Sequence, residues 1–209
     1  MMKLAILAKA RSWYCRDLSR AALERGHRCE RIDFPKLVSS LGGAGTAVAA
    51  GGLDLTTFDA VIIRTMPIGS LEQVVYRMDA LGRLEAAGVA VLNSPKSIEC
   101  AVDKYLASAR LAAAGLIVPP TVACEDSSDA RAAFERLGGD VLVKPIFGSE
   151  GRGIVRVSDP ELAMRTFRTL ERIGAVLYLQ RFIENEGFDV RVLVLDGQVL
   201  GGIRRRANG

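Results

Sequence analysis

The chain has 209 residues, of which 49% are hydrophobic, and this size and composition suffice for a substantial core and one or two domains. The net charge of +4 comes from 22 arginines and six lysines against 24 acidic residues, spread along the chain without a basic tail. So modest an excess argues against a nucleic-acid partner. It fits a small acidic or phosphorylated ligand equally well.

No stretch is typical of an export signal or a membrane span. The apolar run 4–8 stops at Lys9, and the longest uncharged stretch, 37–53, is shorter than the about 20 apolar residues of a span. That stretch is rich in Gly and Ser and predicts a flexible loop. Four scattered cysteines and one histidine argue against a Cys/His zinc site. The cysteines are instead expected to be small buried hydrophobic residues of a protein in a reducing cytoplasm.

The first half of the chain alternates predicted strands and helices. Residues 3–8 predict a buried strand, and 12–25 carry apolar side chains at helical spacing before Gly26. Further strands are expected at 29–34, 60–64 and 89–92, and a helix at 71–87. This alternation predicts parallel βαβ units in a Rossmann-like α/β domain. The turn after the first strand reads AKARSW rather than G-x-G-x-x-G, which argues against a dinucleotide cofactor.

The second half predicts a different organisation. A domain boundary is placed near Asn93, where Asn-Ser-Pro caps a helical stretch that runs to Gly115, so the domains span 1–92 and 93–209. Strands are expected at 121–124, 141–144, 154–157 and 176–180, helices at 127–137 and 159–173, and a hairpin around Asp196–Gly197. This half is predicted to be α+β with antiparallel pairing.

The sequence VKPIFGSEGRGI, residues 143–154, sets Lys144 at the end of an apolar strand with three glycines close behind it. Glycines let backbone N–H groups approach an anion, and a lysine can point a compact positive charge at the same anion. No Lys-Ser/Thr follows the last glycine, so the loop is not a Walker A motif. On this motif alone, a phosphate site and an ordinary Gly-rich turn are equally good interpretations.

Two longer stretches favour the phosphate site. They read NSPKSIECAVDKYLASARLAAAGLIVPPT (93–121) and LYLQRFIENEGFDVRVLVLDGQVLGGIRRRA (177–207), with Lys144 between them. Together with the loop they resemble the ATP-grasp superfamily and, more narrowly, its RimK-like α-L-glutamate ligases. The resemblance covers 93–207 by motif and 1–92 by architecture. It implies a pre-ATP-grasp domain followed by an ATP-grasp domain that is incomplete at its C-terminus.

The resemblance implies ATP as the cofactor, and it implies a role for each matching position. Lys104 and Lys144 match lysines that reach the nucleotide phosphates, and Asp189 matches a residue near the ribose. The flap over the phosphates corresponds to Gly148, Ser149, Glu150, Gly151, Arg152 and Gly153, and the hinge that reads adenine through its backbone to Gln180, Arg181, Phe182 and Ile183. Arg181 stands where the family usually has an acid. Arg191 and Arg205 match catalytic arginines that face the reacting phosphate and carboxylate.

Strand register gives an alternative for one catalytic arginine. A two-residue turn at Asp196–Gly197 pairs Asp189 with Arg204 and sends Arg205 to the opposite face. A bulge at Gly201–Gly202 would instead favour Arg205. For the charges on this otherwise apolar strand, a buried structural ion pair is the alternative to a site.

The resemblance also implies Mg²⁺ or Mn²⁺. The acidic and asparagine ligands of RimK-like ligases are expected beyond Gly209, so no metal ligand is assigned within this chain. The chain is therefore expected to be an ATP-grasp enzyme cut short.

The function implied is an ATP-dependent carboxylate–amine ligase. It would add an amino acid, glutamate in this branch, to a carboxylate acceptor through an acyl phosphate. The acceptor, a protein terminus or a small molecule, stays open, as does the oligomeric state, a homo-oligomer included; no membrane partner is expected. The alternatives are an ATP-binding module without ligase activity and an ATP-grasp ligase of the dipeptide or amino-group-carrier kind.

Four residues of the first half could contact the acceptor. Trp13 and Tyr14 could line a substrate mouth, although packing under the loop is the favoured interpretation. Arg11 and Arg64 each follow a strand, and α/β sheets bind ligands at the carboxyl ends of their strands. These arginines could therefore hold an acidic acceptor.

Overall fold

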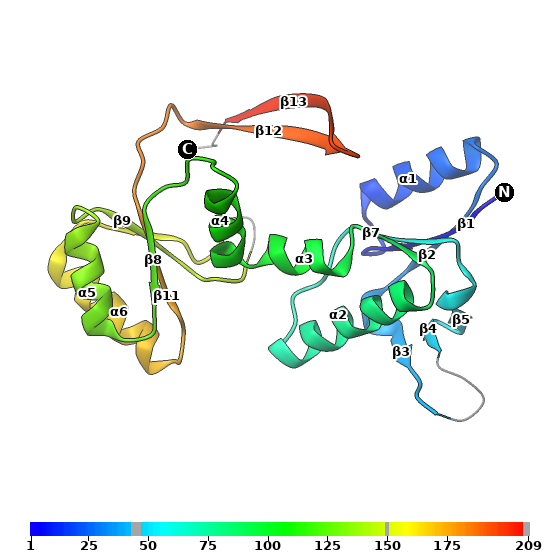
Figure 1. Cartoon of the computed structure of the whole chain (residues 1–209), viewed down its shortest axis with the longest axis horizontal. Coiled ribbons are helices and arrows are strands. Elements are labelled where there is room, and N and C mark those ends of the chain that lie inside the picture. Colours follow the sequence, from blue (N-terminus) through cyan, green and yellow to red (C-terminus); the bar gives the residue numbers. More distant parts are fainter. Residues whose placement is uncertain (43–46, 149–150, 207–209) are drawn as a thin grey trace. The chain divides into compact units, whose positions relative to one another are not determined.

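The computed structural model describes residues 1–42, 47–148 and 151–206, and the chain divides into two compact units, Met1–Asp103 and Lys104–Gly209 (Figure 1). The domain boundary predicted near Asn93 stays a proposal. Helix α3 (Pro95–Val102) lies between that residue and the division of the units.

Unit 1 is built on a parallel four-stranded sheet in the order β2-β1-β6-β7, which confirms the predicted α/β class with βαβ units. The strands are β1 (Lys3–Leu7), β2 (Arg28–Ile32), β6 (Ala60–Ile63) and β7 (Ala90–Leu92). Helix α1 (Trp13–Glu24) connects β1 to β2, and α2 (Leu71–Ala86) connects β6 to β7. Two 3-10 helices, η1 (Phe34–Lys36) and η2 (Leu55–Thr57), lie between β2 and β6 in the chain.

The helices of unit 1 begin at side-chain caps. The Ser12 hydroxyl accepts from the Cys15 amide at the start of α1, and Ser70 forms a capping box with Gln73 at the start of α2. Arg77 of α2 is buried and donates to the Pro67 carbonyl at 2.7 Å. The loop after β6 is thereby fixed to the helix that follows it.

The flexible loop predicted for 37–53 is wrong for part of that stretch. Strands β3 (Leu37–Ser39), β4 (Val48–Ala50) and β5 (Leu53–Asp54) form an antiparallel sheet there. Leu37, Val48 and Ala50 are buried in the unit's core, so burial of these apolar side chains stabilises the sheet despite the glycines around them. Residues 43–46 lie outside the described part of the chain.

Unit 2 contains an antiparallel four-stranded sheet in the order β10-β9-β11-β8, as the α+β prediction requires. Its strands are β8 (Thr121–Cys124), β9 (Val141–Lys144), β10 (Val155–Val157) and β11 (Leu177–Arg181). Helices α5 (Ser127–Arg136) and α6 (Pro160–Arg172) contact each other, with Phe134 and Phe167 edge to face at 6.3 Å between ring centroids. Both rings belong to the hydrophobic core of unit 2.

The single helical stretch predicted from Asn93 to Gly115 is wrong. The structure has two helices, α3 and α4 (Lys104–Ala113), separated at Asp103, whose backbone is extended. The Lys104 amide donates to the Ile146 carbonyl at 3.2 Å instead of continuing α3. The break makes Lys104 the first residue of a new helix.

The C-terminal hairpin pairs β12 (Phe188–Leu195) with β13 (Gln198–Arg206) around the predicted turn at Asp196–Gly197. The predicted pairing of Asp189 with Arg204 is wrong, because the register shifts and Asp189 lies opposite Arg205. The extra residue is Leu200, directly before the glycines at which a bulge was considered. In the described part of the chain, no helix is long and apolar enough to cross a membrane.

Substitution F167A should destabilise the protein by about 3–5 kcal/mol, since Phe167 is fully buried and its loss leaves a cavity against Phe134. Urea unfolding followed by circular dichroism measures the change. The control L162A removes a half-exposed side chain of the same helix and should cost far less. Equal losses for the two variants would contradict the described core of unit 2.

Candidate functional site

The first candidate phosphate ligand, Lys104, is tied to the glycine-rich loop. Its ammonium nitrogen donates to the carbonyl oxygens of Pro145 at 2.9 Å, Ile146 at 3.3 Å and Gly148 at 2.9 Å. Its backbone amide also reaches the Ile146 carbonyl. The first turn of α4 and the start of the loop are therefore one hydrogen-bonded assembly.

The second candidate, Lys144, is the last residue of β9 and is half-buried. Its ammonium nitrogen donates to Gln180 Oε1 at 2.6 Å, and the Gln180 amide nitrogen donates to Thr121 Oγ1 at 2.9 Å. The Thr121 hydroxyl donates in turn to the Pro119 carbonyl. This chain of hydrogen bonds crosses three neighbouring strands and fixes the direction of the lysine.

The two lysines act on each other electrostatically. Burial lowers the pKa of Lys144 below its usual 10.5, and the positive charge of Lys104 lowers that pKa further. Among the described residues, Gln180 supplies the one hydrogen-bond acceptor for the three N–H groups of the Lys144 ammonium. An anion placed between the two ammonium groups would relieve both unfavourable effects.

The loop backbone has the conformation that its glycines allow. Gly148, Gly151 and Gly153 have φ values of 135°, 73° and 74°, and a Cβ on Gly153 would lie 3.4 Å from Pro145 Cγ. The loop therefore turns tightly over the residue that follows Lys144. Two residues of the predicted flap, Ser149 and Glu150, lie outside the described residues.

The predicted adenine hinge lies at the end of β11. The backbone amides of Arg181 and Phe182 donate to the carbonyls of Pro120 and Asp140, so these two N–H groups are already used within unit 2. In the described structure no such partner is present for the Ile183 amide. The use of this segment for adenine stays a prediction. The Arg181 side chain donates to the Leu137 carbonyl at 3.0 Å, which fixes the hinge to the end of α5.

The candidate residues of the hairpin form an exposed ion pair. Arg205 contacts Asp189 through both ends of its guanidinium group, with Nε at 3.0 Å from Oδ1. Arg205 first, and Arg191 more weakly, lowers the pKa of Asp189. Both partners are about half exposed, so the alternative of a buried pair is wrong. Arg204 instead lies over the Phe188 ring at 4.3 Å.

Metal ligands were expected outside this chain. Within residues 1–42, 47–148 and 151–206, no group of three or more His, Cys, Asp or Glu side chains could hold a metal ion. The described residues therefore contain no acidic cluster of that size for a magnesium ion. The use of magnesium stays a prediction.

Two contributors to the lysine site were missed by the sequence analysis. Thr121 begins the hydrogen-bond chain that orients Lys144, and Ser108 of α4 bonds to the buried Tyr178 hydroxyl at 3.1 Å. The second contact holds α4, and therefore Lys104, against the sheet. Both depend on cross-strand and helix–sheet register, which no spacing in the sequence reveals.

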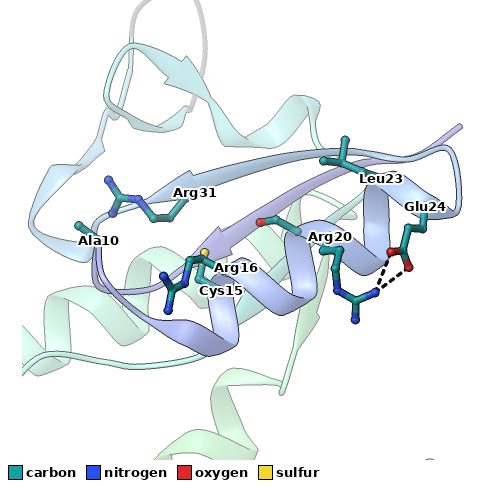
Figure 2. Close-up of a pocket in the computed structure, with 8 residues that line it drawn as sticks. Ala10, Cys15, Arg16, Arg20, Leu23, Glu24 and Arg31 are labelled. Atoms are coloured by element: carbon teal, nitrogen blue, oxygen red, sulfur yellow. Dashed lines mark hydrogen bonds and ion pairs between the residues drawn. The ribbon is translucent and has the colours of Figure 1, made fainter.

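A separate hollow in unit 1, of about 520 Å³, lies between α1 and β2 (Figure 2). Two of its arginines are already paired: Arg20 with Asp17 and Glu24, and Arg31 with Asp33. Because these two arginines are paired with carboxylates, they offer less positive charge to an anionic ligand. The lysine pair of unit 2 is the stronger candidate for a phosphate site.

Solved structures of ATP-grasp proteins share the fold of this chain. A RimK domain ATP-grasp protein from Sphaerobacter thermophilus aligns with a TM-score of 0.76 and 25% identity over 97% of this chain and 72% of its own. The ATP-grasp ligase PsnB, complexed with a minimal precursor, aligns with a TM-score of 0.73 and 24% identity over 98% of this chain and 71% of its own. The predicted fold is thereby confirmed.

More narrowly, the chain belongs to the RimK family: residues 2–98 match the RimK pre-ATP-grasp domain and residues 101–209 the RimK-like ATP-grasp domain. It is 38% identical to the tetrahydromethanopterin:α-L-glutamate ligase of Methanosarcina acetivorans and 32% identical to the ribosomal protein bS6–L-glutamate ligase of Escherichia coli. Each alignment covers 99% of this chain and 68% of the relative. The predicted resemblance to RimK-like glutamate ligases is confirmed.

The pH at which Lys144 is half deprotonated should lie below 10.5, because burial and Lys104 both disfavour its ammonium form. Competitive acetylation over a pH series, read by mass spectrometry, gives this midpoint, with the exposed Lys96 as reference for reagent reactivity. Substitution K104M should move the Lys144 midpoint upward, since it removes the smaller of the two causes. A midpoint at or above 10.5 in the unchanged protein would contradict the described site.

Proposed function

We propose that the chain binds ATP in unit 2 and serves an ATP-dependent ligase that joins an amino acid, glutamate, to a carboxylate acceptor. The observation that carries the proposal is the placement of two lysine ammonium groups at the glycine-rich loop: Lys104 on the Pro145 and Gly148 carbonyls, and half-buried Lys144 on Gln180. Two neighbouring cations under a glycine-rich loop suit a polyphosphate, and family membership supplies the reaction class.

In the proposed reaction, Lys104 and Lys144 hold the phosphates of ATP while backbone N–H groups of the loop cover them. The γ-phosphoryl group passes to the substrate carboxylate, and the amine of glutamate then attacks the acyl phosphate. An amide, ADP and inorganic phosphate result. Fixed cations stabilise the charge that gathers on the transferred oxygens, so no side-chain nucleophile is required.

The remaining predicted roles belong to the same proposal. Gln180, Arg181 and Phe182 are assigned to the adenine side and Asp189 to the ribose side. Arg191 is the best candidate to face the reacting groups, because Arg205 is engaged by Asp189 and Arg204 by Phe188. The ATP-grasp ligase PsnB has also been solved with its minimal precursor, Mg and ADP. That complex supports magnesium as the ion that accompanies the nucleotide in the proposed reaction.

The relatives leave two kinds of acceptor for the proposed ligase. One relative is named for a small molecule, tetrahydromethanopterin, and the other for a ribosomal protein, bS6. Both acceptors suit a cytoplasmic enzyme, and we place this chain there as well.

A second candidate function is an ATP-binding module without ligase activity. It is favoured by the lack of a metal-binding acidic cluster among the described residues. A dipeptide ligase is a third; D-alanyl-alanine synthetase A of Vibrio cholerae shares the fold at 15% identity and a TM-score of 0.65. Release of ADP that depends on glutamate separates the ligase from the module, and replacing glutamate by D-alanine separates the two ligases.

Substitutions K104M and K144M should each weaken ATP binding by roughly 10- to 100-fold, because each removes a charged hydrogen bond worth about 1.5–3 kcal/mol. Isothermal titration calorimetry with and without magnesium measures the affinities. The matched control K96M removes an exposed lysine of α3 and should bind ATP within about twofold of the unchanged protein. ATP binding that survives both site substitutions would overturn the proposed nucleotide site.

A further inference from the structure

The antiparallel sheet of unit 2 has two unlike faces. One face packs into the core with α5 and α6 through apolar side chains at alternate strand positions: Val122, Val141, Val143, Leu177 and Leu179. The positions between them carry Thr121, Gln180 and Lys144 on the opposite face. Gln180 of β11 pairs with Thr121 of β8 on one side and with Leu142 of β9, two residues before Lys144, on the other. Three polar side chains from three strands therefore meet outside the core.

The hydrogen bonds among these side chains run in one direction. The Pro119 carbonyl can only accept, and it takes the single hydroxyl proton of Thr121 at 2.8 Å. Thr121 Oγ1 can then only accept from Gln180, whose amide nitrogen donates to it at 2.9 Å. The Gln180 amide is thereby held with Oε1 toward Lys144, 2.6 Å from the ammonium nitrogen. A reversed amide would set N–H groups against the N–H groups of the lysine.

The acceptor that orients Lys144 is neutral. A lysine carries its charge on a flexible four-carbon stem, so an acceptor of fixed direction decides where that charge lies. A carboxylate at the same place would also orient the ammonium group, but it would neutralise the charge. In the described part of the chain Lys144 has no ion-pair partner. The arrangement fixes the lysine and leaves its full charge for an anion.

We propose that the side chains of Gln180 and Thr121 are positioning residues for Lys144 and aim its uncompensated charge at a phosphate of the nucleotide. Both act through the lysine and not on the base. The adenine role predicted for the segment around Gln180 concerns its backbone, so the side chain has this separate role. The phosphate as target rests on the proposed function, whereas the orientation of Lys144 is present in the protein without nucleotide.

The orientation is tested on the whole chain without nucleotide, by following the pKa of Lys144 with NMR of its side-chain resonances. Q180E should raise this pKa, because a carboxylate stabilises the ammonium form, and Q180M should lower it, because a thioether is a weak acceptor. Lys104, the other charge that shifts the pKa of Lys144, is kept in both variants. Glutamate and methionine resemble glutamine in length, so altered packing alone does not produce opposite shifts.

The target is tested by calorimetry with ATP and with inorganic tripolyphosphate, which lacks the base. T121V and Q180M should weaken the binding of both ligands by the same factor, roughly 3- to 10-fold, because each loses one orienting hydrogen bond. Q180E should weaken both more, since its carboxylate competes with the phosphate for Lys144. T121S keeps the hydroxyl and should bind within about twofold of the unchanged protein. The control T169V removes a hydroxyl of α6 that donates to the Arg165 carbonyl and should change neither affinity.

Three results would overturn the proposal. They are pKa shifts of Lys144 in the same direction in Q180E and Q180M, unchanged ATP affinity in T121V, and weaker binding of ATP without an equal loss for tripolyphosphate, which would give the Gln180 side chain to the base. Urea unfolding checks that each variant is folded, and T121A takes the place of T121V if valine is not tolerated. Equal ATP affinity in K144M and the unchanged protein would instead refute the proposed nucleotide site, while the pKa shifts still decide whether Gln180 orients Lys144.

Discussion

Two like charges held close together dominate the chemistry of unit 2. The Lys104 ammonium is fixed by three carbonyls of the glycine-rich loop, and the Lys144 ammonium by one amide oxygen that Thr121 orients. Burial and mutual repulsion both disfavour the charged form of Lys144. A structural core gains nothing from such an arrangement, whereas a polyanion would be stabilised by it. The helix break at Asp103, the loop glycines and the Ser108–Tyr178 contact all act to maintain this pair.

The elements of both units were largely predictable, because hydrophobic periodicity and capping residues such as Ser70 are local signals. Three features could not be predicted from such local signals. The break between α3 and α4 depends on a hydrogen bond from Lys104 to Ile146, far along the chain. The strands between residues 37 and 54 depend on burial against the unit's core, and the partner of Asp189 depends on one extra residue, Leu200. Each is decided by tertiary contacts that a local pattern does not contain.

The same limit applies to the sites. Motif resemblance singled out Lys104 and Lys144, but the hydrogen bonds that aim them follow from register between strands. In unit 1 the sequence favoured buried packing for Trp13 because large aromatic residues usually lie inside. The structure instead stacks it in the open on Tyr14, with Arg64 on the other face. Unit 2 thus offers positive charge beside groups of fixed orientation, an arrangement suited to phosphates.

The most direct test of the lysine pair is the pKa of Lys144 measured by NMR of its side-chain resonances, with and without saturating ATP. A triphosphate bound between the two ammonium groups stabilises the charged form, so the pKa of Lys144 should rise on adding ATP and stay low with adenosine, which carries no phosphate. An unchanged pKa of Lys144 in the protein saturated with ATP would contradict a nucleotide held by Lys104 and Lys144 together.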